Sequence, residues 1–230
     1  MSLLPARIPD ALLRALWSLR RALGLSPTQR VFRELRRRGV RTESASAVEV
    51  FAGTGFRHTI DYRRDVGQLE VWEINPAHEA ALEKNLPGAT VVITDSFAEV
   101  ARTARRFEIV VVDNTITTFG RGYVEHFDLF PGLFRIVAPE SVLLLNVCPQ
   151  VPPELRSDER RLARRAEFYG TDRPFDVPID QMVRAYERKM SEHGLRLRWH
   201  FDRKRAYRAG IHYLVLAMSA SAAPAPASDS

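Results

Sequence analysis

The stretch Val48-Glu49-Val50-Phe51-Ala52-Gly53-Thr54-Gly55 decides the fold, because an apolar strand here runs straight into a turn that contains two glycines. Such a turn lets backbone N–H groups approach a ligand closely. A second strand is predicted in Leu69-Glu70-Val71-Trp72-Glu73-Ile74-Asn75-Pro76, and it ends at the carboxylate of Glu73. An acid at the tip of the next strand suits the hydroxyl pair of a ribose. The two stretches predict one half of a doubly wound nucleoside-binding site.

Two later apolar runs also end at polar residues. Residues 89–94 lead into Asp95-Ser96-Phe97, and residues 107–112 lead into Asp113-Asn114-Thr115. Because helical stretches separate these runs, the alternation predicts a parallel sheet that is buried on both faces. Ligands of such sheets lie outside the carboxyl ends of the strands. The polar residues that follow the strands are therefore the candidate site.

These stretches resemble the class I S-adenosylmethionine-dependent methyltransferases over residues 47–147, and more weakly as far as Met218. The resemblance implies an α/β fold: a doubly wound, Rossmann-like, mostly parallel seven-stranded sheet with helices on both faces and a C-terminal antiparallel hairpin. It also implies a set of cofactor-binding residues. These are Glu49, Phe51, Ala52, Gly53, Thr54 and Gly55 around the methionine part, Glu73 and Ile74 at the ribose, Asp95, Ser96 and Phe97 at the adenine, and Asp113 near the reactive methyl.

The chain departs from related patterns in two informative places. Phe51 stands where many members of the family have their first glycine, and Phe56 and Arg57 stand where a dinucleotide fingerprint would have its third, so a nicotinamide cofactor fits less well. Enzymes of the family that methylate exocyclic base amines usually carry two prolines and an aromatic residue after the fourth strand. This chain has Asp113-Asn114-Thr115-Ile116, which argues against a flipped adenine or guanine as the acceptor.

The loop after Asp113 emerges where the reactive methyl is expected. It therefore supplies the catalytic candidates Asp113, Asn114, Tyr123 and His126, of which a carboxylate or imidazole could take a proton from a nucleophilic O–H or N–H. Packing roles for Tyr123 and His126 stay open, as does catalysis by alignment alone. Residues 124–138 are predicted to be helical, with Pro131 starting or kinking the main part, and residues 141–147 to form the next strand.

An insertion, residues 149–178, is predicted to form a cap over the mouth of the site, since it opens and closes with prolines and contains a charged helix. Arg164, Arg165, Tyr169 and Arg173 are its candidate substrate-binding residues, because guanidinium groups bind carboxylates or phosphates by bidentate contacts. A solvated, charged helix without a ligand is the alternative. A helix over residues 181–193 and a β-hairpin over residues 195–201 and 211–218 complete the predicted domain.

Two helices are predicted before the sheet. One face of residues 11–23 carries Leu12, Leu13, Leu16, Leu19 and Leu23, and Ser26-Pro27-Thr28-Gln29 has the pattern of a capping box for a helix that reaches Arg38. Packing on the domain, pairing with a second subunit in a homodimer, and binding to a membrane or nucleic acid are all open. The net charge of +6 permits an anionic partner such as RNA, but an arginine bias from base composition and the spread of the basic residues over several elements favour a charge without such a role, so nucleic acid is not favoured.

The chain of 230 residues is read as an N-terminal helical extension (1–44), one catalytic domain (45–218) and a disordered tail (219–230). The single cysteine, Cys148, fits a cytoplasmic setting, and neither a transmembrane segment, a signal peptide nor a metal site is expected. The predicted function is methyl transfer from S-adenosyl-L-methionine to a small or medium-sized acceptor at O or N. An aminopropyl-transferring or other enzyme that uses this cofactor, and a basic RNA-binding or RNA-modifying protein, are the alternatives.

Overall fold

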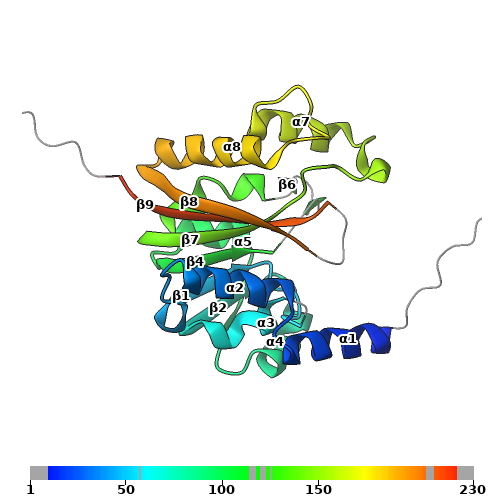
Figure 1. The fold of residues 1–230 in the computed structure, drawn as a ribbon, viewed down its shortest axis with the longest axis vertical. Coiled ribbons are helices and arrows are strands. Elements are labelled where there is room, and N and C mark those ends of the chain that lie inside the picture. The colour runs from blue at the N-terminus through cyan, green and yellow to red at the C-terminus, as the bar shows by residue number, and fades with distance from the viewer. Residues whose placement is uncertain are drawn as a thin grey trace, which may run out of the picture.

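The computed structural model describes residues 10–56, 58–113, 118–119, 123–124, 126–205 and 210–221 (Figure 1). Its centre is a seven-stranded sheet in the order β3-β2-β1-β4-β7-β9-β8, and β5 and β6 form a separate short pair. The strands are β1 (Ser46–Val50), β2 (Gln68–Glu73), β3 (Thr90–Ile93), β4 (Phe107–Val112), β5 (Thr118–Phe119), β6 (Tyr123–Val124), β7 (Val137–Val147), β8 (Leu195–Lys204) and β9 (His212–Ala220). The first five strands of the sheet are parallel, while β9 is antiparallel to both β7 and β8. The predicted fold class is confirmed.

The sheet is buried on both faces, as the continuous apolar runs predict. Successive residues of β4 alternate between two clusters: Val110 faces α8 with Met182 and Tyr186, whereas Val111 shares the other cluster with Phe32 of α2. The helices are α1 (Asp10–Ala22), α2 (Pro27–Arg37), α3 (Thr59–Tyr62), α4 (Glu79–Asn85), α5 (Ser96–Arg102), α6 (Gly132–Arg135), α7 (Glu159–Tyr169) and α8 (Ile179–Glu192). Among the described residues, none of the helices combines the length and apolarity that crossing a bilayer requires.

The outer strand β8 changes its buried side at a bulge. Leu197 pairs with Met218 and Trp199 with Ala217, so Arg198 is an extra residue between them. As a result Leu197 packs on the α8 side of the sheet, and Trp199 packs on the α2 side. One strand thus contributes to the core on both faces.

The two predicted N-terminal helices are present. The Gln29 N–H donates to Ser26 Oγ over 3.1 Å and the Ser26 N–H donates to Gln29 Oε1 over 3.2 Å, which is the predicted capping box. Helix α2 buries Val31, Phe32 and Leu35 against the sheet. Helix α8 ends one residue before the predicted boundary at His193.

Two expectations about the middle and the end of the chain are wrong. Residues 124–138 contain a short 3-10 helix (Phe127–Leu129) and the single turn of α6 instead of one long helix. Pro131 and Gly132 disfavour helix continuation, and β7 already begins at Val137, where it pairs with Phe107. The tail does not begin at residue 219, since Ser219 pairs with Glu140 of β7 and Arg196 of β8. Residues 222–230 lie outside the described residues.

Candidate active site

The register of the sheet brings the predicted residues to one edge. Val50 of β1 pairs with Trp72 of β2 and with Val112 of β4, so the residues that follow these positions lie level at the carboxyl ends of the strands. A cavity of about 320 Å³ opens there. Its lining comprises Glu49, Phe51, Ala52, Gly53, Thr54, Gly55, Phe56, His58, Thr59 and Asp113. Seven of these ten residues were predicted to bind the cofactor.

The glycine turn needs its unusual backbone. Phe51, Gly53 and Gly55 all have positive φ, at 65°, 58° and 68°. Gly53 has no atom near the place where a Cβ would lie, so it leaves open space for a ligand. A Cβ on Gly55 would lie 2.8 Å from Leu86 Cδ1, which shows that this glycine lets the turn pack on α4.

The carboxylate of Glu73 is fixed by backbone donors. Gly53 N–H donates to Oε2 over 2.7 Å and Asn75 N–H donates to Oε1 over 2.9 Å. The next residue, Ile74, is 65% exposed, although it is apolar. A carboxylate has about four acceptor sites, so these two contacts leave capacity for hydroxyl groups of a ligand.

The predicted adenine-binding residues lie at the neighbouring strand end and do not line the cavity itself. Asp95 caps α5 by accepting a hydrogen bond from Phe97 N–H over 2.9 Å. The ring of Phe97 lies 5.5 Å from the ring of Phe51, and Ser96 is buried beneath. The contact between the two rings connects this strand end to the cavity wall.

Asp113 lies among cationic and polar side chains that come from distant parts of the chain. Arg205 Nη1 donates to Asp113 Oδ1 over 3.0 Å, and His58 Nε2 lies 3.5 Å from Oδ2. Arg205 also contacts His58, and the other nitrogen of His58 lies 3.1 Å from the hydroxyl of Tyr213. This hydroxyl in turn lies 3.1 Å from Thr28 Oγ1 at the start of α2. The carboxylate and the imidazole are thereby held in a defined orientation.

Glu49 is buried beneath the cavity. It accepts hydrogen bonds from Thr59 Oγ1 over 2.9 Å and from the hydroxyl of Tyr62, both on the short helix α3. Burial, followed by the nearby charge of Asp113, raises the pKa of Glu49 from 4.5 to about 8. Burial likewise raises the pKa of Tyr62 well above its usual value, so the phenol is a stable donor.

Helix α1 contacts the wall of the cavity through two of its residues. The ring of Trp17 meets the ring of His58 edge-on, with 5.5 Å between their centroids. Arg21 pairs with the buried carboxylate of Asp61 over 2.5 Å and donates to the carbonyl of Phe56 over 3.1 Å. The N-terminal extension is therefore built into the site.

Two of the predicted catalytic residues cannot be placed, and a third lies elsewhere. Asn114 and the side chain of Tyr123 lie outside the described residues. His126 is fully buried, with Nε2 2.5 Å from the hydroxyl of Tyr186 and the rings of Phe127 and Phe130 around it. This environment is a packed aromatic cluster, and His126 does not line the cavity. The structure therefore corrects the catalytic prediction for His126, because the side chain is enclosed by the core.

The predicted substrate-binding residues of the insertion are engaged in packing and in local ion pairs. Arg165 is fully buried and donates to the carbonyls of Pro174 and Cys148, over 2.7 and 2.8 Å. Tyr169 is buried beside Tyr186, Arg164 pairs with Asp128 and Glu167, and Arg173 pairs with Asp176. None of these residues lines the cavity. For Arg165 and Tyr169, burial corrects the prediction, while Arg173 keeps an exposed guanidinium.

Sequence reasoning missed His58, Thr59, Tyr62, Arg205 and Tyr213. His58 follows the glycine turn by only three residues, and Arg205 belongs to the basic stretch Arg203-Lys204-Arg205 between the predicted hairpin strands. Their positions in the sequence could therefore have marked both as candidates. Tyr213 could have been noticed as a polar hydroxyl near the start of an otherwise apolar strand.

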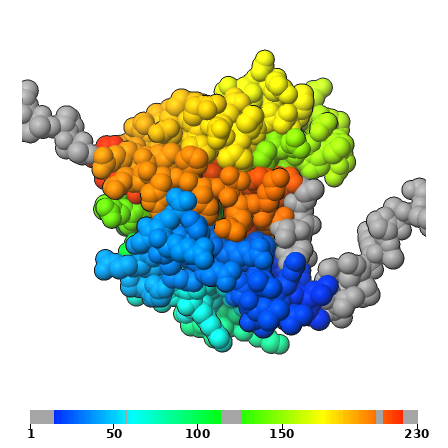
Figure 2. All heavy atoms as spheres, in the orientation of Figure 1, coloured from blue at the N-terminus to red at the C-terminus, as the bar shows by residue number. Residues whose placement is uncertain are grey.

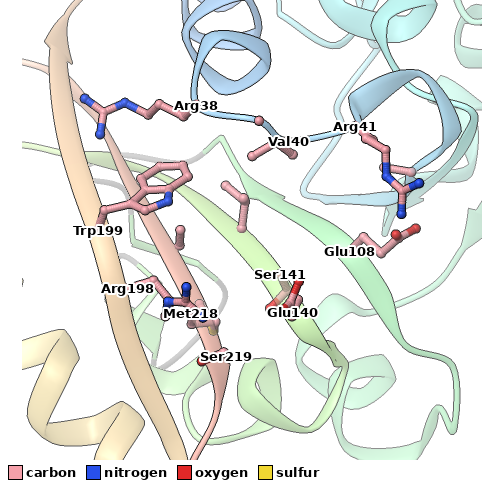
Figure 3. A pocket seen from close by; sticks show the side chains of 14 residues that line it. Arg38, Val40, Arg41, Glu108, Glu140, Ser141, Arg198, Trp199, Met218 and Ser219 are labelled. Atoms are coloured by element: carbon pink, nitrogen blue, oxygen red, sulfur yellow. The ribbon is translucent and has the colours of Figure 1, made fainter.

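A second hollow of about 250 Å³ lies at the opposite, amino ends of β4 and β7 (Figure 3). Arg38, Arg41 and Arg198 line it together with Glu108 and Glu140, so its charges largely offset one another. The guanidinium of Arg38 lies 5.1 Å from the ring of Trp199. This hollow is remote from the glycine turn and from Asp113.

Comparisons with known proteins support the same architecture. No protein-family profile matches the chain, and no curated protein matches it. Among solved structures, a putative RNA methyltransferase from Pyrococcus horikoshii is 15% identical with a TM-score of 0.51, covering 86% of this chain and 83% of that one. A putative S-adenosylmethionine-dependent methyltransferase from Streptococcus mutans is 8% identical with a TM-score of 0.52, covering 82% and 48%. The chain has the fold of the class I S-adenosylmethionine-dependent methyltransferases.

Proposed function

We propose that the protein binds S-adenosyl-L-methionine and transfers its methyl group to a small or medium-sized acceptor at O or N. The observation that carries the proposal is the cavity between the positive-φ glycine turn and Asp113, with the oriented carboxylate of Glu73 at the next strand end. This is the place where doubly wound sheets bind their ligands.

The residues of the cavity fit the chemistry of this cofactor. Its sulfonium and ammonium groups are cationic, and the carboxylate of Asp113 lies within the lining. The open space at Gly53 admits the methionine part, and Glu73 retains acceptor capacity for the ribose hydroxyls. The exposed face of Ile74 and the half-buried side chains of Asp95 and Phe97 are available to the adenine. The cofactor, when bound, supplies an electrophilic methyl group.

The residues around Asp113 can accept the proton that the acceptor loses. An O–H or N–H nucleophile that gains a methyl group must release one proton, and an imidazole or carboxylate in hydrogen-bond reach accepts it. His58 lies in the lining, oriented by Asp113 on one nitrogen and by Tyr213 on the other. Because both ring nitrogens of His58 are engaged, we assign the carboxylate of Asp113 as the base and His58 and Arg205 as the residues that orient it, with Asn114 and Tyr123 as further candidates on the loop. Alignment of the acceptor with the methyl group supplies the rest of the catalysis.

Calorimetric titration with S-adenosylmethionine and with its demethylated product tests the binding half of the proposal. We expect both to bind, and Glu73→Ala to weaken binding by roughly 1–3 kcal/mol, because it removes charged hydrogen bonds. Glu83→Ala, which alters an exposed acid of α4, is the matched control and should leave affinity unchanged. Absence of heat with the wild type, or equal affinities for the two variants, would refute the proposal.

The transfer half is tested with methyl-tritiated S-adenosylmethionine and a metabolite extract as the acceptor source. Asp113→Ala should abolish most of the label transfer while the affinity for the demethylated product changes little, as expected for a group at the reacting centre. A variant that loses only affinity would make Asp113 a binding residue.

A further inference from the structure

Two leucines of helix α1 and one in the turn that follows it point away from the protein. Leu16, Leu19 and Leu23 recur at helical spacing and are 45%, 57% and 61% exposed, whereas the contacts of the helix with the domain come from Trp17 and Arg21. Helix α1 therefore packs on the domain through Trp17 and Arg21, while these leucines face the solvent. Four of the six exposed large apolar side chains among the described residues lie here, counting Leu25 at 42%. An outward leucine stripe on an amphipathic helix requires a cover.

Helix α2 turns arginines outward beside this stripe. It buries Val31, Phe32 and Leu35, and Arg30, Arg33 and Arg37 recur at helical spacing on its exposed side. Within the described part of the chain, Arg30 and Arg33 have no acidic partner. A Cβ on Gly24 would lie 3.4 Å from Arg33 Nη1, so this guanidinium reaches the turn that carries Leu23 and Leu25. Figure 2 shows α1 and α2, in dark and medium blue, next to each other on one face of the molecule.

The net charge of the chain is concentrated in this segment. Residues 1–38 contain nine arginines and two acids, a net charge of +7, whereas residues 39–230 contain 25 basic and 26 acidic residues. The remainder of the protein is thus close to neutral. An arginine bias from base composition would raise the charge of the whole chain, and the observed asymmetry needs a local cause.

We propose that the outward face of α1 and α2 docks the protein on the surface of an anionic lipid bilayer. The leucine stripe would enter the boundary between headgroups and acyl chains, and the neighbouring arginines would lie at the level of the phosphates. A symmetric dimer through this face would bring Arg30 and Arg33 of two copies together, which opposes self-association. A nucleic acid would pair with the arginines but would leave the leucines uncovered.

Sedimentation with vesicles tests this assignment on the full chain. The protein should bind vesicles that contain phosphatidylglycerol and should bind pure phosphatidylcholine far more weakly. L16S/L19S/L23S should bind at least about tenfold more weakly, because each leucine loses its transfer to the apolar phase. R30Q/R33Q should weaken binding about fivefold per arginine and reduce its salt dependence.

Matched variants on other surfaces control for general effects of apolarity and charge. Phe175→Ser removes an exposed apolar side chain in the insertion, and R184Q/R188Q removes two exposed arginines of α8, on the opposite face of the sheet. Both should bind vesicles like the wild type. The proposal is overturned by equal binding to both lipids, by no binding to either, by loss of binding in the controls, or by a wild-type dimer that L16S/L19S/L23S dissociates. Unchanged thermal unfolding of the variants excludes misfolding as the cause.

Discussion

Glu49 makes the clearest prediction at the scale of single residues. Its folded-state pKa of about 8 lies above the ordinary value of 4.5, so between these values the folded protein holds a proton that the unfolded chain has lost. The stabilisation is therefore complete below the unfolded pKa and is lost as pH rises through the folded pKa. Glu49→Gln, which keeps an acceptor for Thr59 and Tyr62, should flatten this fall in the free energy of unfolding.

Urea unfolding of the wild type and Glu49→Gln at a series of pH values between about 5 and 9 measures the difference. Glu83→Gln on the surface of α4 serves as the control, since its acid is exposed and should follow the wild type. Parallel curves for the wild type and Glu49→Gln would mean that Glu49 ionises normally in the fold.

The sequence predicted the site residues that directly follow strands. It did not predict the site residues that come from distant parts of the chain. Gly53, Glu73 and Asp113 could be predicted because each lies at or just after the end of an apolar strand, a pattern that can be recognised locally in the sequence. Arg205 and Tyr213 meet His58 only because β9 is inserted between β7 and β8. Such contacts depend on strand order, and nothing in the local spacing of residues encodes them. His126 shows the converse error. It was predicted to lie at the site because it is close to Asp113 in the sequence, but its side chain packs in the core instead.

At the scale of elements, the close contact between the glycine turn and α4 can be tested. Gly55→Ala combines a positive φ with a Cβ 2.8 Å from Leu86, whereas Gly39→Ala has a positive φ and no atom within 4 Å. Gly39→Ala should cost about 1–2 kcal/mol of stability for the left-handed backbone alone. Gly55→Ala should cost more, because overpacking adds to the strain.

The measurement is the free energy of unfolding of both variants in urea, with binding of the demethylated cofactor as a second readout. We expect Gly55→Ala to lose affinity as the turn shifts and Gly39→Ala to keep it. Equal losses of stability would show that Leu86 moves aside without cost. The start of α2 needed no such tertiary information, since its capping box sets it. The region after β6 was misjudged because residues 124–138 are apolar at helical spacing yet are interrupted by Pro131 and Gly132.

At the scale of the whole molecule, α1 and the glycine turn should respond together to a ligand. Trp17 touches His58 and Arg21 binds the carbonyl of Phe56, and both partners line the cavity. Binding of the demethylated cofactor should therefore slow hydrogen exchange in residues 10–22 as well as in residues 51–56. Helix α8, on the opposite face of the sheet, should be unchanged and provides the internal control.

Hydrogen exchange monitored by mass spectrometry measures all three segments in one experiment. Protection restricted to residues 51–56 would show that α1 is only attached beside the site. The predicted roof formed by residues 149–178 and 114–123 stays a prediction, and the same data show whether it gains protection when acceptor is added.

The position of β9 in the sheet also determines the order in which the strands can pair while the chain is being synthesised. β8 leaves the ribosome before β9, yet its only partner in the sheet is β9. Until β9 is made, β7 presents an unpaired edge of apolar residues, Val142 to Leu145, on a nascent chain whose parallel half can already fold. Open apolar edges of this kind recruit other strands. Folding of the sheet therefore cannot be completed by adding strands in the order in which they are synthesised.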